Sequence, residues 1–147
     1  MPRNAAAYDE DFYAWTQEQA QFVRAGQFPS LDIENLAEEL ESMGRSVRRE
    51  LRNRLAILLM HLLKWEYQPG LQSRSWSGTI REQRRQIKDL LDESLSLMTV
   101  ISADVAHAYG LATINAVAET GLLESAFPPT CPFTPEQILA EDFLPGE

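Results

Sequence analysis

The sequence lacks the features of a protein that is crosslinked by disulfides or anchored in a membrane. Cys131 is the only cysteine among 147 residues, so the chain can form neither an internal disulfide nor a thiolate metal cluster. The longest apolar run, residues 55–63, is closed by Arg54 and Lys64 and is too short to span a bilayer. Residues 1–12 turn acidic without the apolar stretch of a signal peptide. We therefore expect a cytoplasmic protein with no membrane partner.

Residues that could carry out catalysis are equally scarce. The chain has two histidines, His61 and His107, and no nucleophile elbow of the form G-x-S-x-G. The spacing of Asp104 and His107 matches half of a carboxylate–histidine metal site in a helical bundle, but the second half is missing. Cys131 lies between prolines and is expected to be an inert loop thiol. We expect no metal and no cofactor, and the sequence favours a non-enzymatic protein over an enzyme.

The charge of the chain is segregated along the sequence. The net charge is −9, yet residues 45–88 carry 11 basic and 3 acidic residues, and the remainder carries 2 basic and 19 acidic residues. A basic block of this size needs a partner. We expect that this partner is internal, namely the acidic helices of the same protein. The alternative is a polyanion such as a nucleic acid, which an overall negative protein would repel at long range.

A long apolar stripe dominates the helical pattern. Apolar residues at a spacing of three or four run without a break from Ile33 to Trp65, and Asp32 before them is a good N-cap residue. Because the stripe passes through Gly44, we predict one long helix over residues 32–66 with room for a bend there. A break into two helices at Gly44 is the alternative.

The remaining helices are bounded by capping signals. We predict one helix that begins near Asp9 and ends at Gly26, one that begins between Ser75 and Thr79, one that begins at Ser94 or Ser96 and ends at Gly121, and a short one capped by Thr134 with Gln137. The sequence therefore predicts an all-α fold. It is a single domain over residues 1–147, with four main helices in a bundle, a flexible segment 1–7 and a C-terminal strap over 128–147.

Several motifs together resemble a known family. In chain order they are DEDFYAWTQEQA, LDIENLAEELESMGRS, HLLKW, SWSGTIREQR and FPPTCPFTPEQILAEDFLP. This order, from about residue 8 to 145, resembles a bacterial helical family known as domain of unknown function twenty-nine. The resemblance implies an all-helical fold and a bacterial origin, and it carries over no activity, cofactor or catalytic residue. The chain reads ESLSL where relatives read SPSL, which affects only the turn before the fourth helix.

Two groups of polar residues are candidate sites. Glu50, Arg54 and His61 fall within about 40° of each other on the long helix, at 100° per residue, and border its apolar stripe. We favour a structural seam, because a partly buried guanidinium must find partners, over a pocket for a small ligand or an enzyme. The second group is a basic and aromatic patch made of Arg45, Arg48, Arg49, Arg52, Trp65, Trp76, Arg81, Arg84 and Arg85. Such a patch can stack bases and contact phosphates. We favour a structural role instead, in which the tryptophans lie in the core and the arginines bind acidic residues of the same protein.

The second half of the long helix adds apolar residues behind its stripe. Leu59, Met60 and Leu63 make this half apolar all round, and a helix of that kind is buried on several sides. It either runs through the middle of the bundle or is covered by a second subunit. The sequence as a whole favours a protein-interaction or self-associating module that forms a homodimer. Nucleic-acid binding through residues 45–88 and a small-ligand or enzyme site at the Glu50, Arg54 and His61 seam are the alternatives.

Overall fold

A computed structural model of the chain describes residues 3–146 and confirms the predicted all-α class. The described residues contain helices and 3-10 turns and no strand. They divide into two compact units, of which the first ends at Ser46 and the second begins at Val47. A single domain over the whole chain stays a prediction. Of the predicted flexible segment 1–7, residues 1–2 lie outside the described part, and the chain is helical from Arg3.

The first unit begins with two short helices in place of the single helix predicted from Asp9 to Gly26. Helix α1 spans Arg3–Glu10 and helix α2 spans Phe12–Arg24. The prediction is wrong because Asp11 caps α2, its carboxylate accepting a hydrogen bond from the Ala14 amide at 3.0 Å. The predicted end is confirmed, since Gly26 follows α2 with φ +71°, a conformation that favours glycine.

Polar contacts tie these helices to the residues that open the next one. After the 3-10 turn η1 (Phe28–Ser30), Asp32 accepts a hydrogen bond from Trp15 Nε1 at 3.0 Å. The Asp32 amide donates to Gln19 Oε1 at 2.8 Å, and the Tyr8 hydroxyl donates to Glu39. Trp15 is the one apolar side chain of this unit, among those described, that is fully buried, at 2% exposed.

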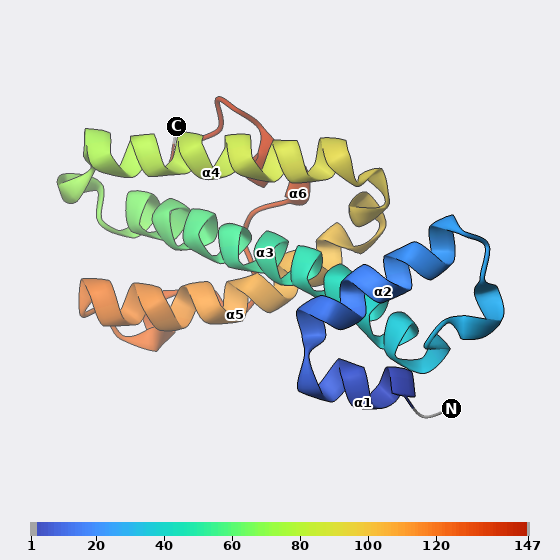
Figure 1. Cartoon of the computed structure of the whole chain (residues 1–147). Helices are drawn as coiled ribbons and strands as arrows, with labels where there is room; N and C mark the ends of the chain where they lie inside the picture. The colour runs from blue at the N-terminus through green and yellow to red at the C-terminus, as the bar shows by residue number, and fades with distance from the viewer. Residues whose placement is uncertain (1–2, 147) are drawn as a thin grey trace. The chain divides into compact units, whose positions relative to one another are not determined.

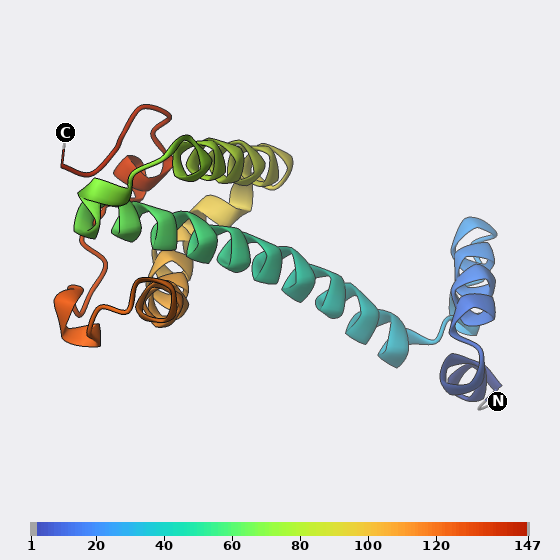
Figure 2. The same ribbon diagram turned by 90° about the vertical axis from the view of Figure 1, so that its left-hand side faces the viewer.

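Helix α3 runs as one element from Ile33 to Tyr67, as predicted, without a break at Gly44 (Figure 2). Asp32 caps it, since its Oδ1 accepts from the Asn35 amide at 3.4 Å. A glycine in a helix interior costs about 1 kcal/mol relative to alanine. The helix passes through Gly44 because the other 34 of its 35 residues outweigh a penalty of that size.

In the second unit α3 lies between two long helices (Figure 1). Helix α4 (Arg74–Glu93) follows the turn η2 (Pro69–Leu71), and helix α5 (Ile101–Thr120) follows the turn η3 (Leu95–Val100). The core is built mainly from α3, α4 and α5, with the most deeply buried apolar side chains at Leu51, Leu55, Leu58, Leu59, Leu62, Leu63, Ile80, Ile87, Ala112, Ala116 and Ile138. The stripe predicted for the second half of α3 is therefore the centre of the core.

The starts of α4 and α5 differ from the prediction. Helix α4 begins at Arg74, because Ser73 caps it by accepting a hydrogen bond from the Trp76 amide at 3.2 Å. The 3-10 turn η3 delays α5 until Ile101, so neither Ser94 nor Ser96 caps it. The predicted end is confirmed: Gly121 closes α5 with φ +72°, the left-handed cap that favours glycine.

The C-terminal strap is anchored on the core. After the turn η4 (Glu124–Ala126), the short helix α6 spans Pro135–Leu139 and carries the predicted capping box between Thr134 and Gln137. Phe133 and Ile138 on either side of the cap are buried, as expected for a hydrophobic staple. The strap thus contributes side chains to the core of the second unit.

Residues Leu95–Thr120 are the one described helical segment whose length and hydropathy would suit a membrane span. Core helices of soluble proteins meet the same criterion. Here α5 buries one side against the core through Ile101, Val105, Ala108, Tyr109, Ala112 and Ala116. The match is one of length and composition alone.

Candidate functional site

The first half of α3 carries an apolar stripe that the chain leaves uncovered. We call Ile33, Leu36, Leu40, Met43 and Val47 the overhang stripe. Leu36 is half-buried, whereas Ile33, Leu40, Met43 and Val47 are 63%, 64%, 57% and 36% exposed. These residues lie within about 80° on the helix, at 100° per residue, which is one continuous apolar face. The sequence predicted this apolar face, and the structure shows that most of it is exposed.

Burial along α3 begins partway through the helix. Helix α3 has 35 residues, which gives about 52 Å at 1.5 Å per residue. The first fully buried residue of α3 is Leu51, so the overhang stripe ends where the core begins.

For Leu59, Met60 and Leu63 the sequence left two alternatives, the middle of the bundle or contact with a second subunit, and the structure agrees with the first. These side chains are 0%, 8% and 0% exposed, because the second half of α3 runs through the middle of the bundle. They belong to the core and cannot meet a second subunit. The exposed apolar residues of α3 lie in its first half instead.

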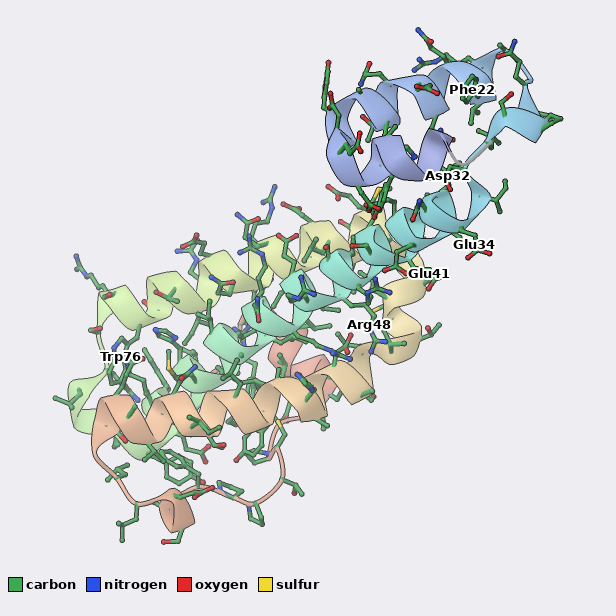
Figure 3. The ribbon with its side chains drawn as sticks, turned by 60° about the horizontal axis from the view of Figure 1, so that its bottom comes forward. Phe22, Asp32, Glu34, Glu41, Arg48 and Trp76 are labelled. Carbon is green, nitrogen blue, oxygen red and sulfur yellow. The ribbon has the colours of Figure 1, made fainter. Side chains whose placement is uncertain are left out.

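The buried carboxylate of Asp104 binds two arginines of the predicted patch. Asp104 of α5 is fully buried, and its Oδ1 accepts from Arg48 at 2.6 Å and from Arg52 Nε at 2.7 Å. Arg48 projects from the side of α3 that faces α5 (Figure 3). The two arginine side chains remain 37% and 33% exposed. The arrangement joins α3 to α5 just beyond the overhang stripe.

The charge state of Asp104 follows from these contacts. Burial alone would raise the pKa of its carboxyl group, but the hydrogen bonds and charges of Arg48 and Arg52 outweigh burial and lower the pKa below 3.8. The carboxylate is therefore ionised at neutral pH. Sequence reasoning considered Asp104 only with His107. The missed signal was an acid placed among the inward-facing apolar residues of its helix, where a carboxylate needs a cationic partner.

The other basic residues of the predicted patch mostly bind partners in their own neighbourhood. Arg45 contacts Glu38 at 2.9 Å, and Arg85 contacts Asp89 at 3.5 Å. Arg84 is buried and donates to the carbonyl oxygens of Ile138 at 2.8 Å and of Gln137 and Glu141 at 3.4 Å. It therefore caps the C-terminal end of α6. Within residues 3–146, Arg49 and Arg81 are the patch arginines that form neither an ion pair nor a side-chain hydrogen bond.

The tryptophans of the patch belong to the core, as we favoured. Trp65 is buried and Trp76 is half-buried against the core. The Lys64 ammonium lies 4.6 Å from the Trp76 ring centroid and 2.9 Å from Glu119 Oε1, so a cation–π contact and an ion pair compensate its burial. The basic and aromatic residues do not assemble into one open patch, because they bind different neighbours.

The three residues of the predicted polar seam do not form one cluster. Arg54 contacts Glu50 at 3.2 Å and Gln83 at 3.3 Å, which joins α3 to α4. His61 instead shares a hydrogen bond of 2.8 Å with the Ile57 carbonyl. Burial and the nearby Lys64 charge lower the pKa of His61. The Glu50–Arg54 pair is structural and His61 does not join it.

Two open grooves lie in the second unit. One, of about 1070 Å³, runs between α5 and the chain from Leu123 to Pro135, and the other, of about 930 Å³, lies between α4 and the strap. Neither groove is lined by the predicted seam residues. In the first groove, burial raises the pKa of the Cys131 thiol and raises the pKa of Tyr109 to about 12. Both groups are therefore protonated at neutral pH and poor nucleophiles.

A family model matches nearly the whole chain. The model described as "Domain of unknown function DUF29" covers residues 7–144. Comparison with curated proteins and with solved structures gives no match. The family match confirms the resemblance inferred from the sequence motifs, and it brings no activity or site with it.

Proposed function

The chain belongs to the family of unknown function DUF29, and we propose that it is a non-enzymatic protein-interaction module. The observation that carries this proposal is the exposure of the overhang stripe. Four of its five apolar side chains are exposed on one helix. Exposed apolar residues that follow helical spacing and have charged neighbours are typical of a helix that packs against a partner.

The composition of the first unit supports the proposal. Besides the overhang stripe, Phe12, Val23 and Phe28 are about half exposed or more, and Trp15 is the one apolar side chain described there that is fully buried. A unit of fewer than about 50 residues with so small a core needs additional apolar contacts. A partner on the overhang stripe would supply them.

The engagement of the arginines favours this proposal over nucleic-acid binding. Arg48, Arg52 and Arg84 hold Asp104 and the α6 carbonyl groups, so each has a structural role. Non-specific nucleic-acid binding depends on cations that are free to replace counterions at phosphates. The enzyme alternative required Glu50, Arg54 and His61 to line a pocket. Because His61 does not join Glu50 and Arg54, the geometry does not favour that alternative.

Site-specific photo-crosslinking in the native host tests the proposal. Leu40 is replaced by a benzophenone amino acid, and the matched control places the same group at the exposed Glu34, about 120° away on the same segment of α3 at 100° per residue. We expect a discrete protein adduct from position 40 and none from position 34. No adduct at position 40, or the same adducts at both positions, would overturn the proposal.

A further inference from the structure

We propose that residues 40–47 of α3 form a hinge, at which the helix bends transiently in solution while the residues on either side stay helical. We call these residues the hinge segment. Three features carry the inference, namely the lack of anchoring contacts along the segment, the exposure of its side chains and its low helix propensity. The hinge goes beyond the proposed function and does not depend on it.

The polar contacts that anchor α3 stop on either side of the hinge segment. Before the segment, Glu39 accepts a hydrogen bond from Tyr8 of α1. After it, Arg48 binds Asp104 of α5. Among the described side-chain contacts of residues 40–47, the ion pairs of Arg45 stay within α3. The hinge segment is thus about 12 Å of helix, at 1.5 Å per residue, that no described polar contact ties to another element.

Apolar packing gives the hinge segment little support. Leu40, Met43 and Val47 are 64%, 57% and 36% exposed, and within the segment only Ser42 is half-buried. The first fully buried residue of α3, Leu51, lies beyond the segment. A helical stretch with few buried apolar contacts opens locally at a lower free-energy cost than one in a core. The segment is therefore the part of α3 between the two units that bends most easily.

The composition of the hinge segment lowers its helix propensity. Gly44 and the serines at 42 and 46 rank below alanine as helix formers. Serine hydroxyls inside a helix compete for backbone carbonyl groups and bend it, and sharp bends occur at glycine and serine pairs. A Cβ built on Gly44 would meet no atom within 4 Å, so the chain has no steric need for glycine there. The effect of Gly44 is to lower the local stability of α3.

The division of the chain points to the same position. The two compact units meet between Ser46 and Val47, inside the hinge segment. Hinges are formed by the few residues that connect two packed bodies and absorb the change in backbone angles. A bend there leaves the contact of Trp15 with Asp32 and the contacts of Asp104 intact, because each of them lies within one unit.

The hinge segment overlaps the overhang stripe, since Leu40, Met43 and Val47 belong to both. Given the proposed function, a partner that packs along the stripe spans the hinge and holds α3 straight, so that binding is coupled to the ordering of the helix. Gly44→Ala, which favours the straight helix in advance, should then raise the yield of the crosslink at position 40. This coupling rests on the proposed function, whereas the hinge itself can be tested on the purified protein.

Distances between spin labels on either side of the hinge segment test the inference. In a Cys131→Ser background, labels are attached to the exposed positions Gln17→Cys of α2 and Asn115→Cys of α5. Double electron–electron resonance then gives the distribution of distances between the labels. We expect a distribution clearly broader than that of the control pair Gln86→Cys and Asn115→Cys, which lies within the second unit. A distribution as narrow as that of the control pair would overturn the inference.

Alanine variants locate the hinge. Gly44→Ala should narrow the distance distribution and slow the amide exchange of residues 41–48, corrected for intrinsic rates, about fivefold. The matched control Gly78→Ala makes the same change in α4, where a Cβ also meets no atom within 4 Å, and should leave both measurements unchanged. Equal effects of the two variants, or a broad distribution that Gly44→Ala leaves unchanged, would overturn a hinge at residues 40–47. Far-ultraviolet circular dichroism checks that each variant remains helical.

The crosslink at position 40 separates the hinge from the proposed function. A crosslink whose yield Gly44→Ala does not change, together with a narrowed distance distribution, keeps the hinge and overturns its coupling to a partner. The absence of any crosslink overturns the proposed function, and the distance distributions alone then decide on the hinge.

Discussion

The two halves of α3 have the same apolar spacing and opposite environments. In the second half Leu55, Leu58 and Leu62 are completely buried, whereas in the first half Ile33, Leu40 and Met43 are more than half exposed. The difference shows what apolar periodicity reports. It identifies the face of a helix that needs a partner, but it does not say whether the same chain provides that partner.

The transition between the halves is marked by charge. Asp104 binds Arg48 and Arg52, which lie between Val47, the last residue of the overhang stripe, and Leu55 in the core. This cluster joins α3 to α5 at the point where burial begins. The comparison of the two halves can be tested residue by residue, because each half offers leucines of the same size in opposite settings.

Leu58→Ala should have the largest effect on stability. The side chain is completely buried, and truncation of a buried leucine costs about 2–5 kcal/mol through lost transfer energy and the cavity that remains. The free energy of unfolding in urea, measured on dilute protein, checks this value. A loss below about 1 kcal/mol would show that the second half of α3 is not the core.

Asp104→Asn should destabilise the protein by about 2 kcal/mol. Removal of one partner from a buried ion pair costs about 3–5 kcal/mol, and the partial exposure of Arg48 and Arg52 reduces that value because water solvates the released cations. Urea unfolding at neutral pH measures the loss. An unchanged stability would show that the cluster does not join α3 to α5.

The same variant should remove part of the dependence of stability on pH. The pKa of Asp104 in the folded protein is lowered below 3.8. Its contribution is therefore fully present above that ordinary value and is lost as the pH falls through the folded pKa. The difference in unfolding free energy between parent and Asp104→Asn should shrink below pH 3.8. A constant difference between acidic and neutral pH would contradict the assigned ion pairs.

Arg84→Lys should loosen the strap at a cost of about 1–2 kcal/mol. A lysine ammonium cannot reach the three carbonyl groups that the planar guanidinium contacts. Hydrogen exchange of residues 133–143 should accelerate together with the loss of stability. Arg85→Lys, at a neighbouring exposed position, is the control and should change stability by less than about 0.5 kcal/mol. Equal effects of the two variants would rule out the capping role.

Leu40→Ala should have the smallest effect. Because the side chain is 64% exposed, the unfolding free energy of dilute protein should change by less than about 0.5 kcal/mol. A loss in dilute protein as large as that of Leu58→Ala would mean that the chain covers its own overhang stripe.

Local signals predicted much of the fold. The end of α5 at Gly121 and the capping box of α6 depend on residues within one helical turn, and the structure confirms both. The continuity of α3 through Gly44, also confirmed, followed from the apolar stripe on both sides of the glycine. Asp11 was misassigned because an acid in the first turn of one helix and an N-cap within a helix pair look alike in sequence. The 3-10 turn η3 has no comparable local signal, so the start of α5 was placed too early.

The candidate site was harder to predict because its contacts join distant residues. Arg84 reaches a carbonyl group 54 positions away, and Arg48 reaches Asp104 across 56 positions. Charge segregation indicated that the arginines needed acidic partners, and it favoured partners in the same fold without saying which ones. Leu40 and Met43 have the same spacing as the buried residues of α3, so the sequence carried no signal of their exposure.

Hydrogen exchange of the backbone amides, followed by mass spectrometry of dilute protein, tests the central claim most directly. We predict that peptides covering residues 33–46 exchange rapidly. Peptides covering residues 51–65 should remain protected throughout, because they form the core. Equal protection of both halves of α3 in dilute protein would contradict the account, since it would show that the chain itself covers the overhang stripe.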